Sequence, residues 1–411
     1  MTHPDGPARP ARPTTGKVTA TVTARGPRRA LAAGCCVLFA ALWPSNLDAQ
    51  CAAVQPLALS GDIGFRMETI RNEDFAEGRS TSPDDHRYRW RGRARLAGTY
   101  CADSPWSAGL RLTTGSPSYP SSAWTSFSDN LTRDDVALDR FYVRWTPNSS
   151  FRARFGADGN PIPHPLEIVW DGDVQLSGLA QIWSPGRLRI VATQSMLREA
   201  RDTRRVGGAF LTTFGGRIET TRVRAGVFAY NYSDADAVAT AIRSQTLSRD
   251  YATNRLLPSD SSRFFSGFNL LGANVDFQAG RLRVLAEAAV NSSARADASL
   301  GPAYASRENL AFGAEGRIGG NAGRWDWGLR AGYVHIEADA TLAAFNSDDL
   351  QQTNVRTVTL RADATMPGGG QLIWDTYIQR KLDLALPSPG GLTHAQNATK
   401  LRSRLSIALS F

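Results

Sequence analysis

Residues 87–100 read RYRWRGRARLAGTY and place an arginine at every second position. Successive side chains of a β-strand leave on opposite faces, so one face of this segment would be cationic and the other apolar, as at Trp90 and Leu96. The cationic face consists of Arg87, Arg89, Arg91, Arg93 and Arg95, named here the arginine row. Such a strand fits a soluble sandwich with arginines toward solvent, or a transmembrane barrel with arginines toward a lumen.

The start of the chain favours export. Residues 1–29 are basic, Ala30–Trp43 is an apolar run too short to span a bilayer, and small residues precede a cleavage site after Ala49. We therefore predict a signal peptide with an extended basic n-region over residues 1–49 and a single domain over 50–411. The remaining chain has no run of about 18 apolar residues, which excludes a helical membrane span.

The charge of the chain gives little support to nucleic-acid binding. The full sequence has a formal net charge of +9. The signal contains six cationic and two acidic residues, and removing this excess of four leaves +5. A balance this small disfavours a nucleic-acid binder, so the arginines have to be explained by where they lie.

Short and long connections alternate along the chain. Seven short turns are expected near 101–105, 146–150, 184–187, 219–222, 278–281, 319–324 and 367–370. Eight longer polar stretches are expected near 71–86, 115–137, 157–174, 195–205, 233–264, 292–308, 337–355 and 382–397. These fifteen connections join sixteen strands, with short periplasmic turns and long extracellular loops. The sequence thus predicts an all-β fold, a transmembrane antiparallel up-and-down β-barrel.

Most of the expected strands alternate between apolar and polar residues. The first places Leu59 and Phe65 on one face and Asp62 and Arg66 on the other. The last places Leu401, Leu405, Ile407 and Leu409 opposite Lys400, Arg402, Arg404 and Ser406. Two segments, 175–183 and 223–232, are ambiguous because their alternation is weak.

Aromatic residues give a second indication of a membrane barrel. They flank the short turns at Tyr100, Trp106, Trp145, Phe151, Trp183, Trp325 and Trp327. Amphipathic rings gather at a membrane interface, which predicts an aromatic girdle at one rim. Phe411 ends the chain after an alternating strand, which is the pattern expected for delivery to the barrel-assembly machinery.

Five segments resemble the bacterial putative porin family of outer-membrane barrels. They are RYRWRGRARLAGTY, WSAGLRLTTGSP at 106–117, DDVALDRFYVRWTPN at 134–148, FRARFGADGNPI at 151–162 and VWDGDVQLSGLA at 169–180. The resemblance is strongest over residues 87–182. It implies a Gram-negative outer-membrane porin for passive diffusion of small hydrophilic solutes. It transfers no catalytic residue.

The arginines predict a preference for anions. Like charges in a row are costly in an apolar core but stay hydrated in a water-filled lumen, where low-dielectric walls focus their field. The expected basic pore lining consists of Arg87, Arg89, Arg91, Arg93, Arg95, Arg111, Arg140, Arg144, Arg152 and Arg154. The alternative is ordinary lumen polarity in which acids balance these charges.

The stretch 157–174, ADGNPIPHPLEIVWDGDV, is stiffened by prolines and carries Glu167, Asp171 and Asp173. By analogy with porins of general type, we expect it to fold into the lumen and place these acids opposite the arginine row. The alternative is an external loop packed on the rim.

Two functional classes stay open. One is a diffusion porin, with a channel for an acidic sugar or phosphate as its more specific form; the other is a non-conducting barrel that acts as an adhesin or receptor. The expected partners are outer-membrane lipid and lipopolysaccharide, the assembly machinery and small solutes, and a homotrimer is left open. We expect no nucleic acid.

Catalytic and metal sites are not expected. The five histidines show no metal-ligand spacing, and no serine, histidine and acid set suggests a hydrolase, so we expect no enzyme, cofactor or metal. After signal removal two cysteines remain, Cys51 and Cys101, both near the expected periplasmic rim. We predict that they form a disulfide; two free thiols are the alternative.

Overall fold

The computed structural model describes residues 56–72, 86–102, 104–116, 118–127, 135–198, 209–248, 251–323, 325–350, 353–367, 370–383 and 399–411. They all belong to one compact unit, Ser45–Phe411. The expected export signal and Cys51 lie outside the described residues. Within the described ranges, no helix is both long and apolar enough to cross a membrane.

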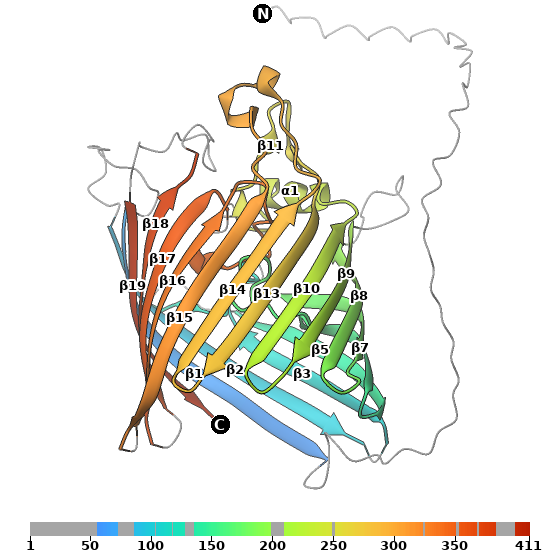
Figure 1. The fold of residues 1–411 in the computed structure, drawn as a ribbon, viewed down its shortest axis with the longest axis vertical. Helices are drawn as coiled ribbons and strands as arrows, with labels where there is room; N and C mark the ends of the chain where they lie inside the picture. Colours follow the sequence, from blue (N-terminus) through green and yellow to red (C-terminus); the bar gives the residue numbers. More distant parts are fainter. Residues whose placement is uncertain are drawn as a thin grey trace, which may run out of the picture. The chain divides into compact units, whose positions relative to one another are not determined.

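Sixteen antiparallel strands form one closed sheet, as the alternation of the sequence predicts (Figure 1). The strands are β1 (Leu57–Arg71), β2 (His86–Cys101), β3 (Trp106–Thr114), β5 (Val136–Asn148), β6 (Phe151–Gly159), β7 (Gln175–Trp183), β8 (Leu188–Arg198), β9 (Ala209–Glu219), β10 (Val223–Tyr232), β13 (Asn269–Ala279), β14 (Leu282–Asn291), β15 (Leu310–Ala322), β16 (Trp325–Ile336), β17 (Val355–Thr365), β18 (Gln371–Lys381) and β19 (Thr399–Ser410). The two ambiguous segments are strands β7 and β10.

The first and last strands close the barrel. β1 pairs with β19 from Asp62 opposite Ser410 to Arg71 opposite Leu401. Phe411 continues this pairing, since its N–H donates to the carbonyl of Gly61 at 3.0 Å and its carbonyl accepts from the Gly61 N–H at 2.9 Å. Closure pairs the edges of the sheet with each other, which a strand structure in lipid requires.

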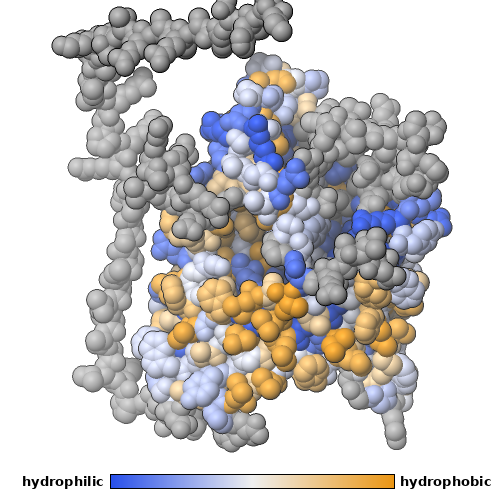
Figure 2. Space-filling view, turned by 180° about the vertical axis from the view of Figure 1, so that it is seen from behind, coloured by the Kyte–Doolittle hydropathy of each residue, from blue (hydrophilic) through white to orange (hydrophobic). Residues whose placement is uncertain are grey.

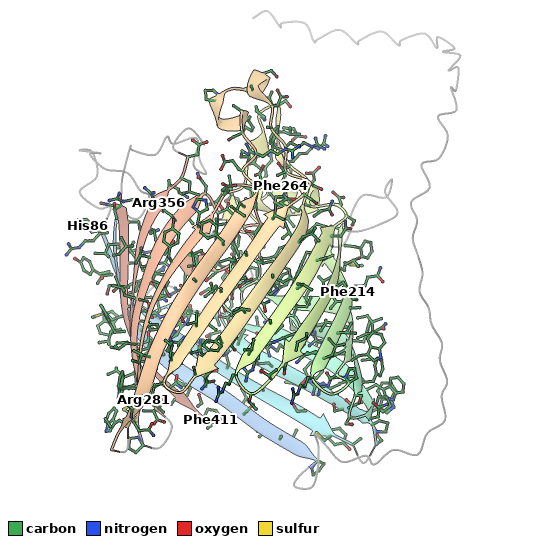
Figure 3. All side chains as sticks on the ribbon, viewed as in Figure 1. His86, Phe214, Phe264, Arg281, Arg356 and Phe411 are labelled. Atoms are coloured by element: carbon green, nitrogen blue, oxygen red, sulfur yellow. The ribbon has the colours of Figure 1, made fainter. Side chains whose placement is uncertain are left out.

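The two rims differ as expected. Turns between β2 and β3, β5 and β6, and so on to β17 and β18 are short, whereas the long connections carry the extra elements. Figure 3 shows Arg281 and Phe411 at the rim with the short turns and His86, Arg356 and Phe264 at the rim with the long loops. The long loops carry β4 (Thr125–Ser126), α1 (Asp236–Arg243), β11 (Leu256–Leu257), β12 (Asp260–Phe264), η2 (Ala298–Leu300), η3 (Pro302–Tyr304) and η4 (Asp348–Leu350).

The outer face is apolar and ends in an aromatic girdle. Leu59, Phe65 and Trp90 are all more than half exposed. Apolar residues form a broad band across the face of the barrel seen in the space-filling view (Figure 2). At the short-turn rim, neighbouring aromatic rings lie 5.2–6.1 Å apart between centroids in the series Trp106, Trp145, Phe151 and Trp183. This confirms the expected girdle on this side of the barrel.

The interior is not uniformly polar. Inward-facing side chains of β7 to β10 and β13 to β16 pack with loop residues into a buried apolar cluster. β10 contributes Phe228 and Tyr230, and β7 contributes Leu176 and Ile182. These strands are therefore apolar on both faces, which is why their sequences show weak alternation. The cluster occupies interior space that a simple water-filled barrel would leave open.

Candidate pore lining

The arginine row lies on the inner face of β2, directly beside β1. The register places Asp62 opposite Arg95 and Glu68 opposite Arg89. Asp62 accepts hydrogen bonds from Arg93 at 2.8 Å and from Arg95 at 2.6 Å. Carboxylates of β1 therefore offset the repulsion within the row, in addition to any hydration of the lumen.

The second carboxylate of β1, Glu68, interacts with arginines at the other end of the row. Glu68 is fully buried, accepts a hydrogen bond from Arg89 and lies 3.9 Å from a guanidinium nitrogen of Arg91. Arg91 also donates to the carbonyl of Trp124 at 2.6 Å. Arg87 is exposed at the end of the row that adjoins the long loops.

Barrel closure extends the cationic wall to β19. The inner faces of β19, β1 and β2 together carry nine cations and two carboxylates, Asp62 and Glu68. The cations outside the arginine row are Lys400, Arg402, Arg404 and Arg66. The alternation of the first and last strands predicts polar faces for these four residues but does not by itself join them to the row. The signal for doing so was available, because the first and last strands of a closed barrel are neighbours.

The expected basic residues of β3, β5 and β6 also face the interior, and most have acidic partners. Arg111 donates to Asp139 at 3.0 Å. Arg154 and Arg140 share Asp158 at 2.7 Å and 3.3 Å.

Two further predicted arginines lie nearer the short-turn ends of these strands. The Arg144 guanidinium lies over the Tyr142 ring at 4.9 Å. Arg152 follows the turn after β5 and lies on the same strand face as Arg154. The ten arginines therefore lie on one wall of the barrel, many of them in ion pairs, and their role as a pore lining stays a prediction.

The stretch between β6 and β7, residues 160–174, crosses the interior and is named here the interior loop. His164 lies 2.6 Å from Glu287 of β14 and 2.6 Å from the hydroxyl of Tyr230 on β10. The carbonyl of Pro163 accepts a hydrogen bond from Asn274 of β13 at 2.9 Å. These contacts hold the loop against the wall opposite the arginine row.

The three predicted acids of the interior loop occupy different surroundings. Asp173 accepts a hydrogen bond from Arg95 at 3.1 Å, as expected for an acid facing the row. Glu167 instead accepts from the N–H of Gly172 at 3.2 Å, and Asp171 from the N–H of Asp173 at 2.6 Å. Burial, with added repulsion from nearby carboxylates, raises the pKa of Glu167 to about 8 and also raises the pKa of Asp171.

A second loop also folds inward through its described residues 337–350, 353 and 354, which the sequence does not predict. Phe345 stacks on Trp170 of the interior loop with ring centroids 4.9 Å apart, and its carbonyl accepts a hydrogen bond from the N–H of Asp171 at 2.6 Å. Asp349 accepts a hydrogen bond from Arg404 at 2.8 Å. Burial opposes ionisation of Asp349, but the Arg404 cation outweighs it and lowers its pKa. The loop thus bridges the apolar cluster and the cationic wall.

One of the two cysteines predicted to form a disulfide lies among the described residues. Cys101 is disulfide-bonded, while Cys51 lies outside the described residues, so their pairing stays a prediction. In the described part of the chain, no group of three or more histidine, cysteine, aspartate or glutamate side chains is arranged to hold a metal ion.

Two chemically different cavities lie inside the barrel. One, of about 450 Å³, lies between the inward loops and the wall of β15 to β19 and β1, and it is lined by charged side chains. The other, of about 560 Å³, lies near α1 and is lined largely by apolar side chains such as Leu197, Val238 and Phe345.

A closed antiparallel barrel with a lipid-facing apolar band and a charged inner wall defines a transmembrane β-barrel of porin type. Residues 45–242 match the family described as Putative porin, which confirms the resemblance expected from residues 87–182. The barrel architecture and the family match together support a porin channel in the outer membrane.

Comparison with solved structures finds porins at low sequence identity. A mutant of the Rh. blastica porin is 9% identical, covering 86% of this chain and 100% of that chain, with a TM-score of 0.49. A triple mutant of the Rhodopseudomonas blastica porin is 8% identical over the same shares, with a TM-score of 0.48. No protein with a curated function matches this chain.

Proposed function

We propose that this barrel is a porin that lets small hydrophilic solutes diffuse passively across the outer membrane with a preference for anions. The observation that carries this proposal is the excess of cations on the inner faces of β19, β1 and β2, where nine cations accompany two strand carboxylates. A wall of one net sign raises the local concentration of counter-ions in a narrow passage.

The inward loops set where solutes pass. The interior loop faces the arginine row through Asp173, while its other side is anchored by His164. We propose that this loop is the constriction and that solutes pass between it and the cationic wall. Opposed acids and cations across a constriction create a transverse field, which orients dipolar solutes.

Ion conductance in planar bilayers tests the porin proposal against a non-conducting adhesin or receptor. A porin gives stepwise current increases when the purified barrel is added to the bilayer. A barrel whose loops alone carry its function gives none. A channel dedicated to an acidic sugar or a phosphate would show saturable block of the chloride current by that solute.

A further inference from the structure

Arg66 differs from the other arginines that line the charged cavity. Five arginines line it: Arg66, Arg93, Arg330, Arg361 and Arg404. Four of them have a carboxylate oxygen within 4.0 Å, namely Arg93, Arg330, Arg361 and Arg404. For Arg66, the described ranges of the chain contain no such oxygen.

The hydrogen bonds of Arg66 leave most of its donors available. Its Nε donates to the hydroxyl of Ser406 at 3.2 Å, and this is the one hydrogen bond of its side chain to the described parts of the chain. A guanidinium carries five N–H donors in a planar fork, so the two terminal nitrogens have four N–H groups for a ligand.

Trp124 orients this fork. The guanidinium carbon of Arg66 lies 3.9 Å from the centroid of the Trp124 ring. Stacking covers the face of the guanidinium and leaves its N–H edge open, which suits bidentate binding of an oxyanion. Trp124 can lie there because Gly64 has no side chain: a Cβ at that position would lie 2.9 Å from the ring.

We propose that Arg66 is the centre of a binding site for the carboxylate or phosphate group of a small solute inside this cavity. The cavity volume of about 450 Å³ lies in the range of small-molecule sites. This inference deepens the proposed porin function by naming the solute chemistry, and it assigns binding to β1 rather than to the arginine row.

The test measures binding in detergent-solubilised protein by line broadening, with inorganic phosphate followed by phosphorus NMR and carbon-labelled acetate by carbon NMR. Wild-type protein is expected to broaden at least one of the two signals saturably, and the pair shows which anion is preferred. Arg66→Gln is expected to weaken binding about tenfold or more, as loss of a charge-assisted bidentate contact implies. Arg330→Gln removes the same charge from the same cavity, but from a residue paired with Glu315 and Asp363. It removes no bidentate contact to the anion, so it should weaken binding clearly less than Arg66→Gln does.

A heat-dependent shift in gel mobility checks that each variant is folded. If Arg66→Gln does not fold, Arg66→Lys replaces it, because lysine keeps the charge and loses the planar fork, and binding should fall several-fold. The site is refuted if wild-type protein binds neither anion, if the Arg66 variant binds as wild type does, or if both glutamine variants lose binding equally. Anion binding without bilayer conductance would refute the porin function and leave the Arg66 site standing. Conductance together with wild-type binding in Arg66→Gln would refute the site and leave the porin function standing.

Discussion

Asp173 of the interior loop accepts a hydrogen bond from Arg95 of the arginine row at 3.1 Å. This ion pair is the direct contact between the proposed constriction and the cationic wall. Arg95 also binds Asp62 at 2.6 Å, so the arginine stays held on its strand without Asp173. Asp173 therefore mainly adds negative charge to the passage and is not needed to hold Arg95 in place.

Replacing Asp173 with asparagine should increase anion preference. A unit charge about 4 Å from an ion changes its energy by about 1 kcal/mol in water. Loss of the negative charge favours the anion and disfavours the cation by this amount, so the anion-to-cation permeability ratio should rise by at most about 30-fold. The reversal potential in a salt gradient measures this ratio. Asp297→Asn makes the same charge change at the exposed start of η2 and should have no effect. An equal shift in both variants would contradict the assignment of Asp173 to the passage.

The apolar cluster should hold the interior loop in place. Trp170 is 2% exposed and stacks on Phe345, and truncating a buried tryptophan to alanine typically costs about 3–5 kcal/mol. Trp170→Ala should lower the unfolding temperature and increase the single-channel conductance, because the loop loses its packing. Trp90→Ala on the lipid face should leave conductance unchanged. Wild-type conductance in Trp170→Ala would show that the cluster does not limit the passage.

Gly64 should be required for the position of Trp124. Because a Cβ there would lie 2.9 Å from the ring, Gly64→Ala should displace Trp124 or strain β1, at a cost of about 1–3 kcal/mol. Thermal unfolding monitored by gel mobility measures the loss. Gly316 of β15 has no neighbouring atom within 4 Å of its ideal Cβ, so Gly316→Ala is the matched control. Equal stability of the two variants would argue against the tight contact.

Anion preference should fall as pH rises from 7 to 9. Burial raises the pKa of Glu167 to about 8, so this carboxyl is mostly protonated at pH 7 and becomes negative above pH 8. Asp348, whose pKa burial raises to about 6, is already mostly ionised in this range. The reversal potential should therefore move toward the cation side between pH 7 and 9, and Glu167→Gln should reduce that movement. A pH response unchanged in Glu167→Gln would assign it to another group.

The raised pKa of Glu167 also makes the free energy of unfolding depend on pH. A carboxyl that holds its proton more tightly when folded binds more protons in the folded state than in the unfolded one between pH about 4.5 and 8. Its contribution to the free energy of unfolding therefore falls as pH rises through this window. Glu167→Gln should make the unfolding temperature less sensitive to pH over the same range.

The strands, the two kinds of connection and the outward residues followed from the sequence. Period-two alternation can be read from neighbouring residues alone. Because one side of each strand faces lipid, every second residue on that side has to be apolar, as at Phe65 and Trp90. The arginine row could be predicted for the same reason, because its five residues alternate within one strand. Its partners on β1 could not, because the pairing of Asp62 with Arg93 depends on a register across a long loop.

The interior could not be predicted in the same way. The buried cluster makes β7 and β10 apolar on both faces, so alternation gives no signal at Ile182 or Tyr230. Contacts such as Trp170 with Phe345 join loops far apart in the chain, and their residue types alone do not specify a partner. Of the three loop acids expected to face the arginine row, one has a direct contact with it, since backbone N–H groups of the loop itself hold the other two.

The reversal potential of the wild-type protein in a potassium chloride gradient tests the central claim most directly. An arginine-lined passage predicts a potential on the anion side, and the double variant Arg91→Ala with Arg93→Ala should move it toward zero because the wall loses two cations. A potential on the cation side in the wild type, or the same potential in the double variant, would contradict an anion preference that originates in this wall.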